Sequence, residues 1–322
     1  MTAPITLVAF AVLAATLGPR LLARSPWPDR SPRMGILAWQ ALSFSVVAAV
    51  VLAGAALALP AVPFSTDIAE LLSACAMALR AQYATPGGAA VSATGVVLAI
   101  TVLARAGYCL TAGLVTATRE RRRQLDALTL IARPHERCDA MVVDHSAAAA
   151  YCLPGRRQQV VLTTAALAAL DEDQLAAVLA HERAHLRGRH HLVLAASAAL
   201  ARAFPRVPAF RAAHRELTRL VEMFADDVAA RRNDRLTIAT ALVRLAEASA
   251  PAAALGAGGS TSLARVRRLV APAQPLGATR SLLAAVATAA LLAIPVAVVA
   301  APAVVAATAD LCPIDFPAGT FS

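Results

Sequence analysis

The chain has 322 residues, of which 58% are hydrophobic, and a formal net charge of +10 in which every basic residue is Arg. Soluble globular proteins are about 45–50% apolar, so this composition argues against an ordinary soluble protein and indicates membrane spans. The arginines flank the apolar blocks, which membrane topology explains better than direct nucleic-acid binding does.

Four segments are long and apolar enough to cross a bilayer, which takes about 20 apolar residues. In chain order they are residues 4–23, 35–59, 89–118 and 281–307. The first is a poor signal peptide, because its arginines follow the apolar stretch instead of preceding it. We therefore expect an α-helical membrane protein with four transmembrane helices.

The distribution of Arg predicts how these spans are oriented. One cluster of arginines follows the first span and another follows the third, whereas the loop between the second and third spans has only Arg80 beside two acids, and the tail has no Arg. The two clusters are Arg20, Arg24, Arg30 and Arg33, and Arg119, Arg121, Arg122 and Arg123. The positive-inside rule places both clusters in the cytoplasm and both termini outside the cell membrane. Arg105, inside the third span, is expected to snorkel toward the inner face.

This orientation predicts the domain organisation. Residues 1–118 form a membrane region, 119–280 a cytoplasmic domain, 281–307 the fourth span and 308–322 a short extracytoplasmic tail. Within the cytoplasmic domain, residues 140–143 and 159–163 read as strands and 153–155 as a turn. An acidic start at 171–173 opens one helix, and a second long helix covers about 209–231. We expect a mainly α domain with a small sheet, of the α+β class.

The first of these helices carries His181-Glu182-Arg183-Ala184-His185. Two histidines four residues apart share one helix face and can bind one metal ion, which predicts a Zn²⁺ site. Zinc lowers the pKa of a bound water to about 7, and Glu182 can act as the base that takes its proton. The alternative is a chance HExxH on a solvated helix. It is disfavoured because the motif follows the strand, turn and amphipathic helix of a zincin-like domain and has an acidic motif downstream.

An acidic pair on the second helix completes the predicted site. Glu222 and Asp226 are four residues apart, so Glu222 can be the third zinc ligand while Asp226 accepts a hydrogen bond from a ligand histidine. The alternative is two solvated acids on an Arg-rich helix. Asp227 points elsewhere and is expected to pair with an Arg.

A competing assignment takes the third ligand from another residue. The spacing of His181, His185, Gly188 and His191 also fits the metzincin pattern, with Met223 as its methionine-turn residue. Metzincins are not typically embedded between membrane spans, and the pair Glu222–Asp226 would then have no role, so we favour Glu222.

Residues 176–186, taken with Glu222 and Asp226, resemble the BlaR/MecR-type antirepressor metallopeptidases and their HtpX-type relatives. Residues 150–155 with the strand that follows them, and the Arg265-containing segment 262–266, also resemble parts of these families. The resemblance implies that the strand before HExxH forms the substrate-binding edge. Three spans, a protease domain and a fourth span favour the BlaR/MecR type. BlaR/MecR proteins carry a penicillin-binding domain after the last span; after residue 307 we expect only a short tail here, and therefore no direct β-lactam sensing.

The predicted function is hydrolysis of peptide bonds by a zinc metalloendopeptidase that uses a metal-activated water. It would cleave a BlaI/MecI-type repressor or itself in signalling, or, alternatively, act as an HtpX-like quality-control protease on membrane proteins. A non-enzymatic signalling protein with a structural zinc is disfavoured by Glu182, since a structural site needs no base. His214 and Arg265 are the candidate stabilisers of the oxyanion.

The cysteines yield one further prediction. On the predicted topology Cys75 and Cys312 both lie on the oxidising side and can form a disulfide, although two unpaired thiols are an equal alternative. Cys138 and Cys152 face the reducing cytoplasm and should be free.

Overall fold

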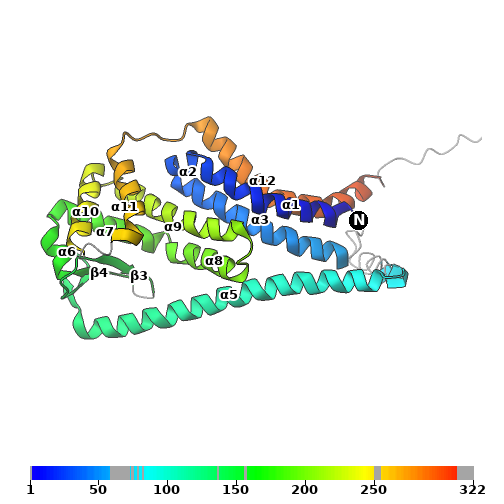
Figure 1. Cartoon of the computed structure of the whole chain (residues 1–322), viewed down its shortest axis with the longest axis horizontal. Coiled ribbons are helices and arrows are strands. Elements are labelled where there is room, and N and C mark those ends of the chain that lie inside the picture. Colours follow the sequence, from blue (N-terminus) through cyan, green and yellow to red (C-terminus); the bar gives the residue numbers. More distant parts are fainter. Residues whose placement is uncertain are drawn as a thin grey trace, which may run out of the picture.

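The structure, a computed structural model, describes residues 2–58, 73, 76–77, 80–81, 83–135, 138–155, 158–249 and 255–309. Long helices form a stalk at one end, and short helices with a small sheet form a head at the other (Figure 1). The helices are α1 (Thr2–Arg24), α2 (Trp27–Arg30), α3 (Pro32–Ala58), α5 (Gly88–Ile131), α6 (Thr164–Ala169), α7 (Glu172–Arg187), α8 (His190–Ala203), α9 (Pro208–Ala229), α10 (Arg235–Ala248), α11 (Leu255–Val270) and α12 (Ala278–Ala309).

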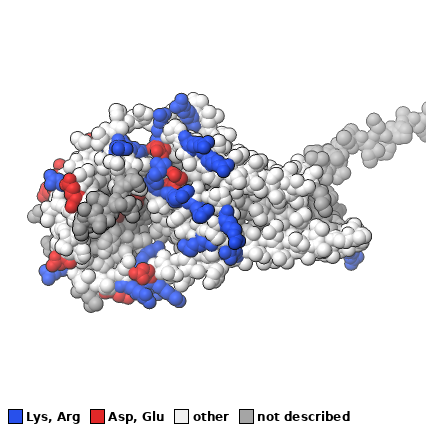
Figure 2. Space-filling view, in the orientation of Figure 1, with Lys and Arg blue, Asp and Glu red and all other residues white. Residues whose placement is uncertain are grey.

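Four described helices, α1, α3, α5 and α12, are long and apolar enough to cross a membrane, and they correspond to the four predicted spans. The N-terminus and the end of α12 lie at the stalk end, away from the head (Figure 1). On the visible face the stalk has almost no charged side chain, and arginines form a band where the stalk meets the head (Figure 2). By composition and arrangement, the stalk is suited to a bilayer.

The third span continues into the head without a break. Helix α5 has 44 residues and runs to Ile131, so the boundary predicted at residue 118 falls inside a helix. Its last turns leave the apolar region and dock on the sheet, where Leu128 packs against Leu153 and Val161. The apolar stretch of α5 and the turns that dock on the sheet therefore belong to one helix.

The sheet has four strands in the order β1-β2-β4-β3. The strands are β1 (Arg133–His135), β2 (Ala140–Val143), β3 (Ala150–Leu153) and β4 (Gln159–Thr163). Strand β4 pairs in parallel with β2 and antiparallel with β3, with Tyr151 opposite Val161. Strands β2 and β4 match the predicted ranges, whereas β1 and β3 were not predicted, because three or four half-exposed residues show little apolar alternation.

The largest core joins the head to the spans. Trp39 and Leu42 of α3 pack with Phe210, Leu217 and Leu220 of α9 in one buried cluster, and α8 lies against the same cluster. The α8–α9 hairpin, residues 190–229, therefore packs along the long apolar helices.

Two arginines tie this hairpin to α5. Arg105, expected to snorkel, donates from Nε to the carbonyl oxygen of Ala203 at the end of α8. Arg202 of α8 donates to the carbonyl oxygen of Cys109 at 3.3 Å. The Arg105 guanidinium thus satisfies a carbonyl oxygen at the C-terminal end of α8, which has no partner within that helix.

Of the cysteines in the described residues, Cys109, Cys138 and Cys152 are free thiols. This agrees with the expectation for Cys138 and Cys152. The disulfide predicted between Cys75 and Cys312 lies outside the described residues.

Candidate metal centre

Helix α7 begins where its acidic start predicted. Asp171 caps it, accepting a hydrogen bond from the Gln174 amide at 2.8 Å, while the Gln174 side chain accepts from the Asp171 amide at 3.3 Å. This reciprocal capping box fixes the first turn of the helix. Leu179 and Leu186 are buried against the sheet, and this packing sets the direction of the His181 face.

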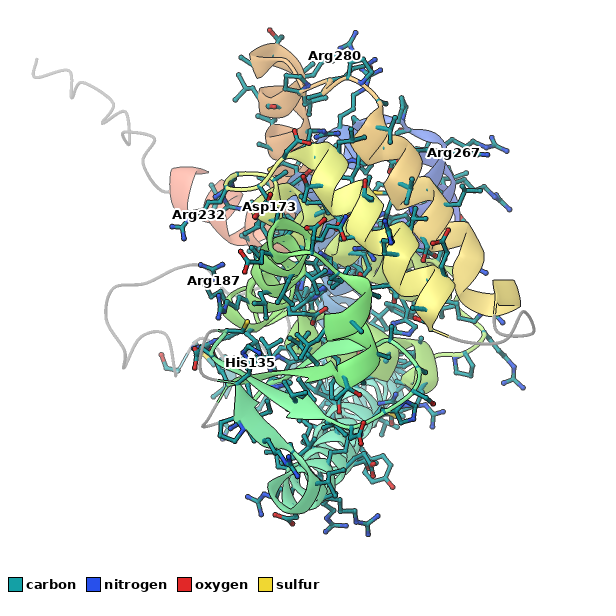
Figure 3. All side chains as sticks on the ribbon, turned by 90° about the vertical axis from the view of Figure 1, so that its left-hand side faces the viewer. His135, Asp173, Arg187, Arg232, Arg267 and Arg280 are labelled. Atoms are coloured by element: carbon teal, nitrogen blue, oxygen red, sulfur yellow. The ribbon has the colours of Figure 1, made fainter. Side chains whose placement is uncertain are left out.

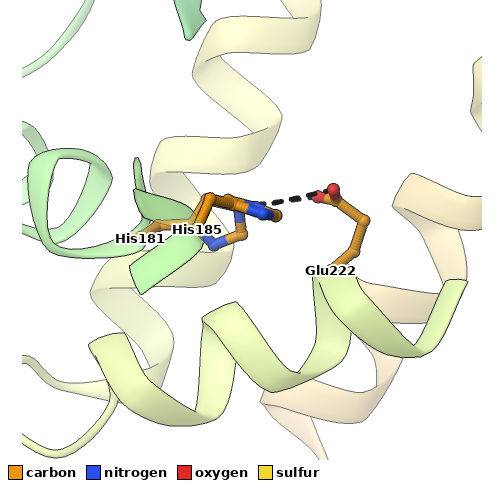
Figure 4. Close-up of side chains that lie close together, drawn as sticks. All are labelled: His181, His185 and Glu222. Atoms are coloured by element: carbon orange, nitrogen blue, oxygen red, sulfur yellow. Dashed lines mark hydrogen bonds and ion pairs between the residues drawn. The ribbon is translucent and has the colours of Figure 1, made fainter. Parts of the chain in front are cut away.

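Helix α9 brings the acidic pair to that face. It is strongly amphipathic, and its buried Leu217, Leu220 and Val221 anchor it on the spans. Glu222 and Asp226 then project toward α7 from the C-terminal half of α9, as Figure 4 shows for Glu222.

The side chains of His181, His185 and Glu222 converge, with one ligand atom from each lying within 4.8 Å of the others. The two Nε2 atoms are 3.0 Å apart, and Glu222 carboxylate oxygens lie 3.5 Å from the His181 Nε2 and 3.6 Å from the His185 Nε2 (Figure 4). Tetrahedral ligands at zinc bond lengths of about 2.0–2.2 Å lie about 3.3–3.6 Å from each other. This two-nitrogen, one-oxygen set therefore fits a catalytic metal ion.

A carboxylate and a guanidinium hold the first histidine. His181 Nδ1 lies 2.9 Å from Asp226, which is only 1% exposed, so the imidazole donates there and directs Nε2 toward the other two ligands. Arg265 of α11 donates to both oxygens of Asp226, at 2.8 and 2.7 Å, and to Glu222 at 2.9 Å. The buried charges on this side are thus paired with each other.

These contacts decide the protonation of the same groups. Burial lowers the pKa of His181, but the hydrogen bonds that its ring donates to Asp226 and Glu222 outweigh burial and raise that pKa to about 9. Burial raises the pKa of Asp226, but Arg265 and His181 outweigh it and hold that pKa below its usual value. For Glu222 the hydrogen bond with His181 and the charge of Arg265 likewise outweigh burial, so its pKa is lowered.

The second histidine is held by His190, which the sequence did not single out. The Nδ1 atoms of His185 and His190 are 2.9 Å apart, and His190 is 3% exposed and packs on Phe224. Burial lowers the pKa of both rings to about 4, so both are neutral near pH 7. His185 needs a free Nε2 to bind a metal, so its Nδ1–H donates to His190.

The turn between α7 and α8 places the His190 ring against His185. Gly188 ends α7, and Arg189 takes the left-handed conformation at φ 49°. A Cβ at residue 188 would collide with the ring of His190. The glycine that resembles a metzincin signature therefore makes room for His190. The sequence signal for this contact was Gly188 followed, after Arg189, by two histidines.

Glu182 lies beside the converging ligands, and its carboxyl group contacts the Cys152 thiol of β3. Burial raises the pKa of Glu182 to about 7, and the charge of Glu222 adds to this rise while His181 opposes it. Burial, followed by the charge of Glu182, raises the pKa of Cys152 to about 12, so the thiol remains protonated and can donate to the carboxylate. A carboxylate with this pKa can both accept and return a proton near neutral pH.

A model described as peptidase family M48 matches residues 115–293, more than half of the chain. The chain belongs to peptidase family M48. Comparisons with curated proteins and with solved structures gave no match. Membership makes the chain a metallopeptidase, while the more specific resemblance to BlaR/MecR proteins stays a prediction. The match begins in the last part of α5 and ends within α12, so it contains every residue of the converging site.

The M48 site opens into a cavity of about 480 Å³. Its walls include the metal-facing residues, the edge strand β3 through Tyr151 and Cys152, and apolar α10 side chains such as Leu242 and Leu245. Viewed from the head end, α10 and α11 lie above the sheet (Figure 3). Strand β3 is at the edge of the sheet, and no further described strand pairs with it. An extended peptide can add to such an edge. The resemblance implied that the strand after residues 150–155 is this edge; that was wrong, because the strand, β4, lies between β2 and β3.

The remaining predicted residues lie at different distances from this site. Arg265 lines the cavity, whereas His214 hydrogen-bonds Ser197 at 2.9 Å and is not among the described lining residues. His191 lines the cavity but, of the described residues, the converging group contains Glu222 and not His191. Met223 is buried beside Arg219, whose Nη1 lies 3.7 Å from its sulfur. Asp227 pairs with Arg268 at 2.7 Å, as predicted for an acid on another face.

Proposed function

We propose that this M48 metallopeptidase is a membrane-embedded, zinc-dependent endopeptidase with its catalytic domain in the cytoplasm. The observation that carries the proposal is the convergence of His181, His185 and Glu222, with Glu182 beside them. A structural metal site would not need an additional carboxylate of raised pKa at the ligands.

The chemistry divides between the metal and the chain. Bound zinc supplies a Lewis acid that polarises the scissile carbonyl and makes water more acidic. Glu182 takes a proton from the water as its oxygen attacks the carbonyl carbon. Glu182 then gives that proton to the leaving nitrogen as the C–N bond breaks. Asp226 keeps His181 in the tautomer that leaves Nε2 free.

Arg265 is the better placed of the two candidates for the oxyanion. It lines the cavity, and His214 is turned toward Ser197 on α8. The hydrogen bonds of Arg265 to Asp226 and Glu222 also make it the group that positions both carboxylates. We propose that its main contribution is this positioning, together with the positive potential that it adds to the cavity.

The membrane location rests on the four apolar helices and on the Arg clusters at their head-side ends. Both described chain ends lie away from the head (Figure 1), as an N-out, C-out topology requires. We expect the protein to resist carbonate extraction. A reporter enzyme that works only outside the cytoplasm should be active when it is fused to the C-terminus. One that works only in the cytoplasm should be inactive there. A C-terminal reporter active only in the cytoplasm would contradict this orientation.

For the substrate we propose a protein segment that binds in extended form along β3. The layout of three spans, catalytic domain and fourth span supports a cytoplasmic BlaI/MecI-type repressor, or the chain itself, as the substrate. One observation favours the alternative of quality control on membrane proteins. The α8–α9 hairpin packs along the spans while α9 carries Glu222, so the site is tied directly to the membrane region.

Two experiments test the proposal. Purified protein should cleave an unstructured protein substrate, lose this activity with a zinc chelator, and regain it with stoichiometric Zn²⁺. In cells, proteins whose cytoplasmic fragments accumulate with wild type but not with Glu182→Gln identify the substrate. A repressor among them supports signalling, and a set of damaged membrane proteins supports quality control. Chelator-resistant cleavage would overturn the zinc assignment.

A further inference from the structure

A second cavity, of about 390 Å³, lies between the spans at the end nearest the head. Its walls come from the last turns of α1, from Trp27 of α2, from Ala38 of α3 and from the first turns of α12. A volume of this size holds a drug-sized ligand or part of a larger one. The metal site is lined by other residues, so this cavity has no part in the hydrolysis.

The lining is polar at one end and apolar along the helices, apart from Thr288, whose hydroxyl donates to the Ala284 carbonyl of its own helix. Aliphatic side chains of α1 and α12 form the walls: Leu21, Leu22, Leu283, Ala284, Ala287 and Leu291. Ser25, Trp27 and Arg280 add polar groups where α1 ends and α12 begins. Trp is the residue that prefers the boundary between hydrocarbon and headgroups. A ligand that fits both parts has a hydrocarbon chain and a polar head.

The charge at the polar end selects an anion. Arg280 is exposed and extends from the start of α12 (Figure 3). In the described part of the chain, no acid lines this cavity and no ion pair involves Arg280. The first turn of α12 adds the positive end of a helix dipole. Figure 2 shows that arginines gather at this level of the molecule.

We propose that this cavity binds one anionic phospholipid of the cytoplasmic leaflet, with its phosphate at Arg280 and one acyl chain between α1 and α12. The cytoplasmic leaflet carries the anionic lipids that basic side chains at the membrane surface attract. A free phosphate does not fit as well, because most of the lining is apolar. The proposal rests on the proposed membrane location and topology, and it is independent of the metal.

The bound lipid would lie next to a helix that is linked to the metal site. Trp27 belongs to α2, in which the Asp29 carboxylate bonds Arg219 of α9 at 2.7 Å and the Asp29 carbonyl accepts from Arg268 of α11 at 2.9 Å. Helices α9 and α11 carry Glu222 and Arg265. A lipid that orders α2 would therefore support the helices that form the site.

The test measures lipid retention by the whole protein. Wild type, Arg280→Gln and Ala284→Phe are reconstituted in nanodiscs of phosphatidylcholine with one-fifth phosphatidylglycerol, released, and analysed by native mass spectrometry. Arg267→Gln is the matched control, because Arg267 is an Arg on α11 that does not line the cavity. Lipid titration in detergent gives the relative affinities, and carbonate extraction with peptidase turnover is measured on the same proteins.

We expect wild type and Arg267→Gln to retain one phosphatidylglycerol. Arg280→Gln should bind it about fivefold more weakly, as loss of one basic contact predicts. Ala284→Phe should lose it by filling the cavity. Equal retention by all four proteins, or phosphatidylcholine bound as tightly as phosphatidylglycerol, would overturn the proposal. Loss of the protein from carbonate-washed membranes would instead overturn the membrane location itself.

Discussion

The two histidines of the HExxH helix are held in different ways on the two sides of the site. On the side of α9 and α11, His181 meets Asp226, which Arg265 holds in turn, so this side is built from buried charges. On the side of α8, His185 meets neutral His190. Glu222 lies between them, within 3.6 Å of both rings. One histidine of the motif is thus held by charged groups and the other by a neutral ring. Mutations on the two sides should therefore weaken zinc binding to different extents.

The largest effect is expected from Glu222→Ala, which removes the group shared by both sides. The variant should lose most of its zinc and all measurable turnover, because two histidines alone make a poor zinc site. Zinc per protein is measured by inductively coupled plasma mass spectrometry. His191→Ala is the matched control and should keep both properties. Zinc lost from His191→Ala but retained by Glu222→Ala would establish the metzincin-like assignment.

Glu182→Gln should impair catalysis without changing the contacts that hold the two histidines. The amide cannot take a proton from water, so turnover should fall by about 10²–10⁴-fold while zinc content stays at the wild-type level. Zinc stoichiometry and the kcat for a quenched peptide give the two readouts. Unchanged kcat would show that another residue is the base.

Asp226→Asn breaks the charged side. The amide keeps the shape but loses the charge, so His181 is less well oriented and Arg265 is left with weaker pairing. Zinc affinity should fall by about 10–100-fold. Competition with a chromophoric chelator measures it. An affinity equal to wild type would mean that Asp226 serves only packing.

The pH dependence of zinc binding should come from the charged side as well. The pKa of His181 is raised to about 9 and that of His185 is lowered to about 4. Below pH 9 zinc must therefore displace a proton from His181, while His185 has none to lose above pH 5. Apparent affinity should rise by about tenfold per pH unit between pH 6 and 8. The slope should flatten in Asp226→Asn, whose His181 pKa is lower, and a flat wild-type profile would contradict the proposal.

The smallest effect is expected on the neutral side. His190→Phe keeps a ring against Phe224 but removes the acceptor of the His185 Nδ1–H. Loss of one neutral hydrogen bond should weaken zinc binding by about fivefold. Gly188→Ala should act in the same direction, because its Cβ displaces the His190 ring. If His190→Phe equals Asp226→Asn in effect, the two sides support the metal equally.

The sequence by itself determined what depends on local pattern. Apolar length predicted four spans, and capping at Asp171 with i, i+4 spacing placed His181 and His185 on one helix face. The same spacing placed Glu222 and Asp226 on one face of another helix, but it carried no information on their distance from α7. Periodicity suffices for these features because each lies within a single helix.

Tertiary structure decided everything that depends on two elements meeting. The turn at Gly188 places His190 against His185, and Arg265 of α11 contacts Asp226 of α9. His214 hydrogen-bonds Ser197. Tertiary structure also laid the α8–α9 hairpin along the spans and continued α5 into the head. These contacts depend on which buried faces match between segments far apart in the chain, and packing across such distances leaves no periodic signal in the sequence.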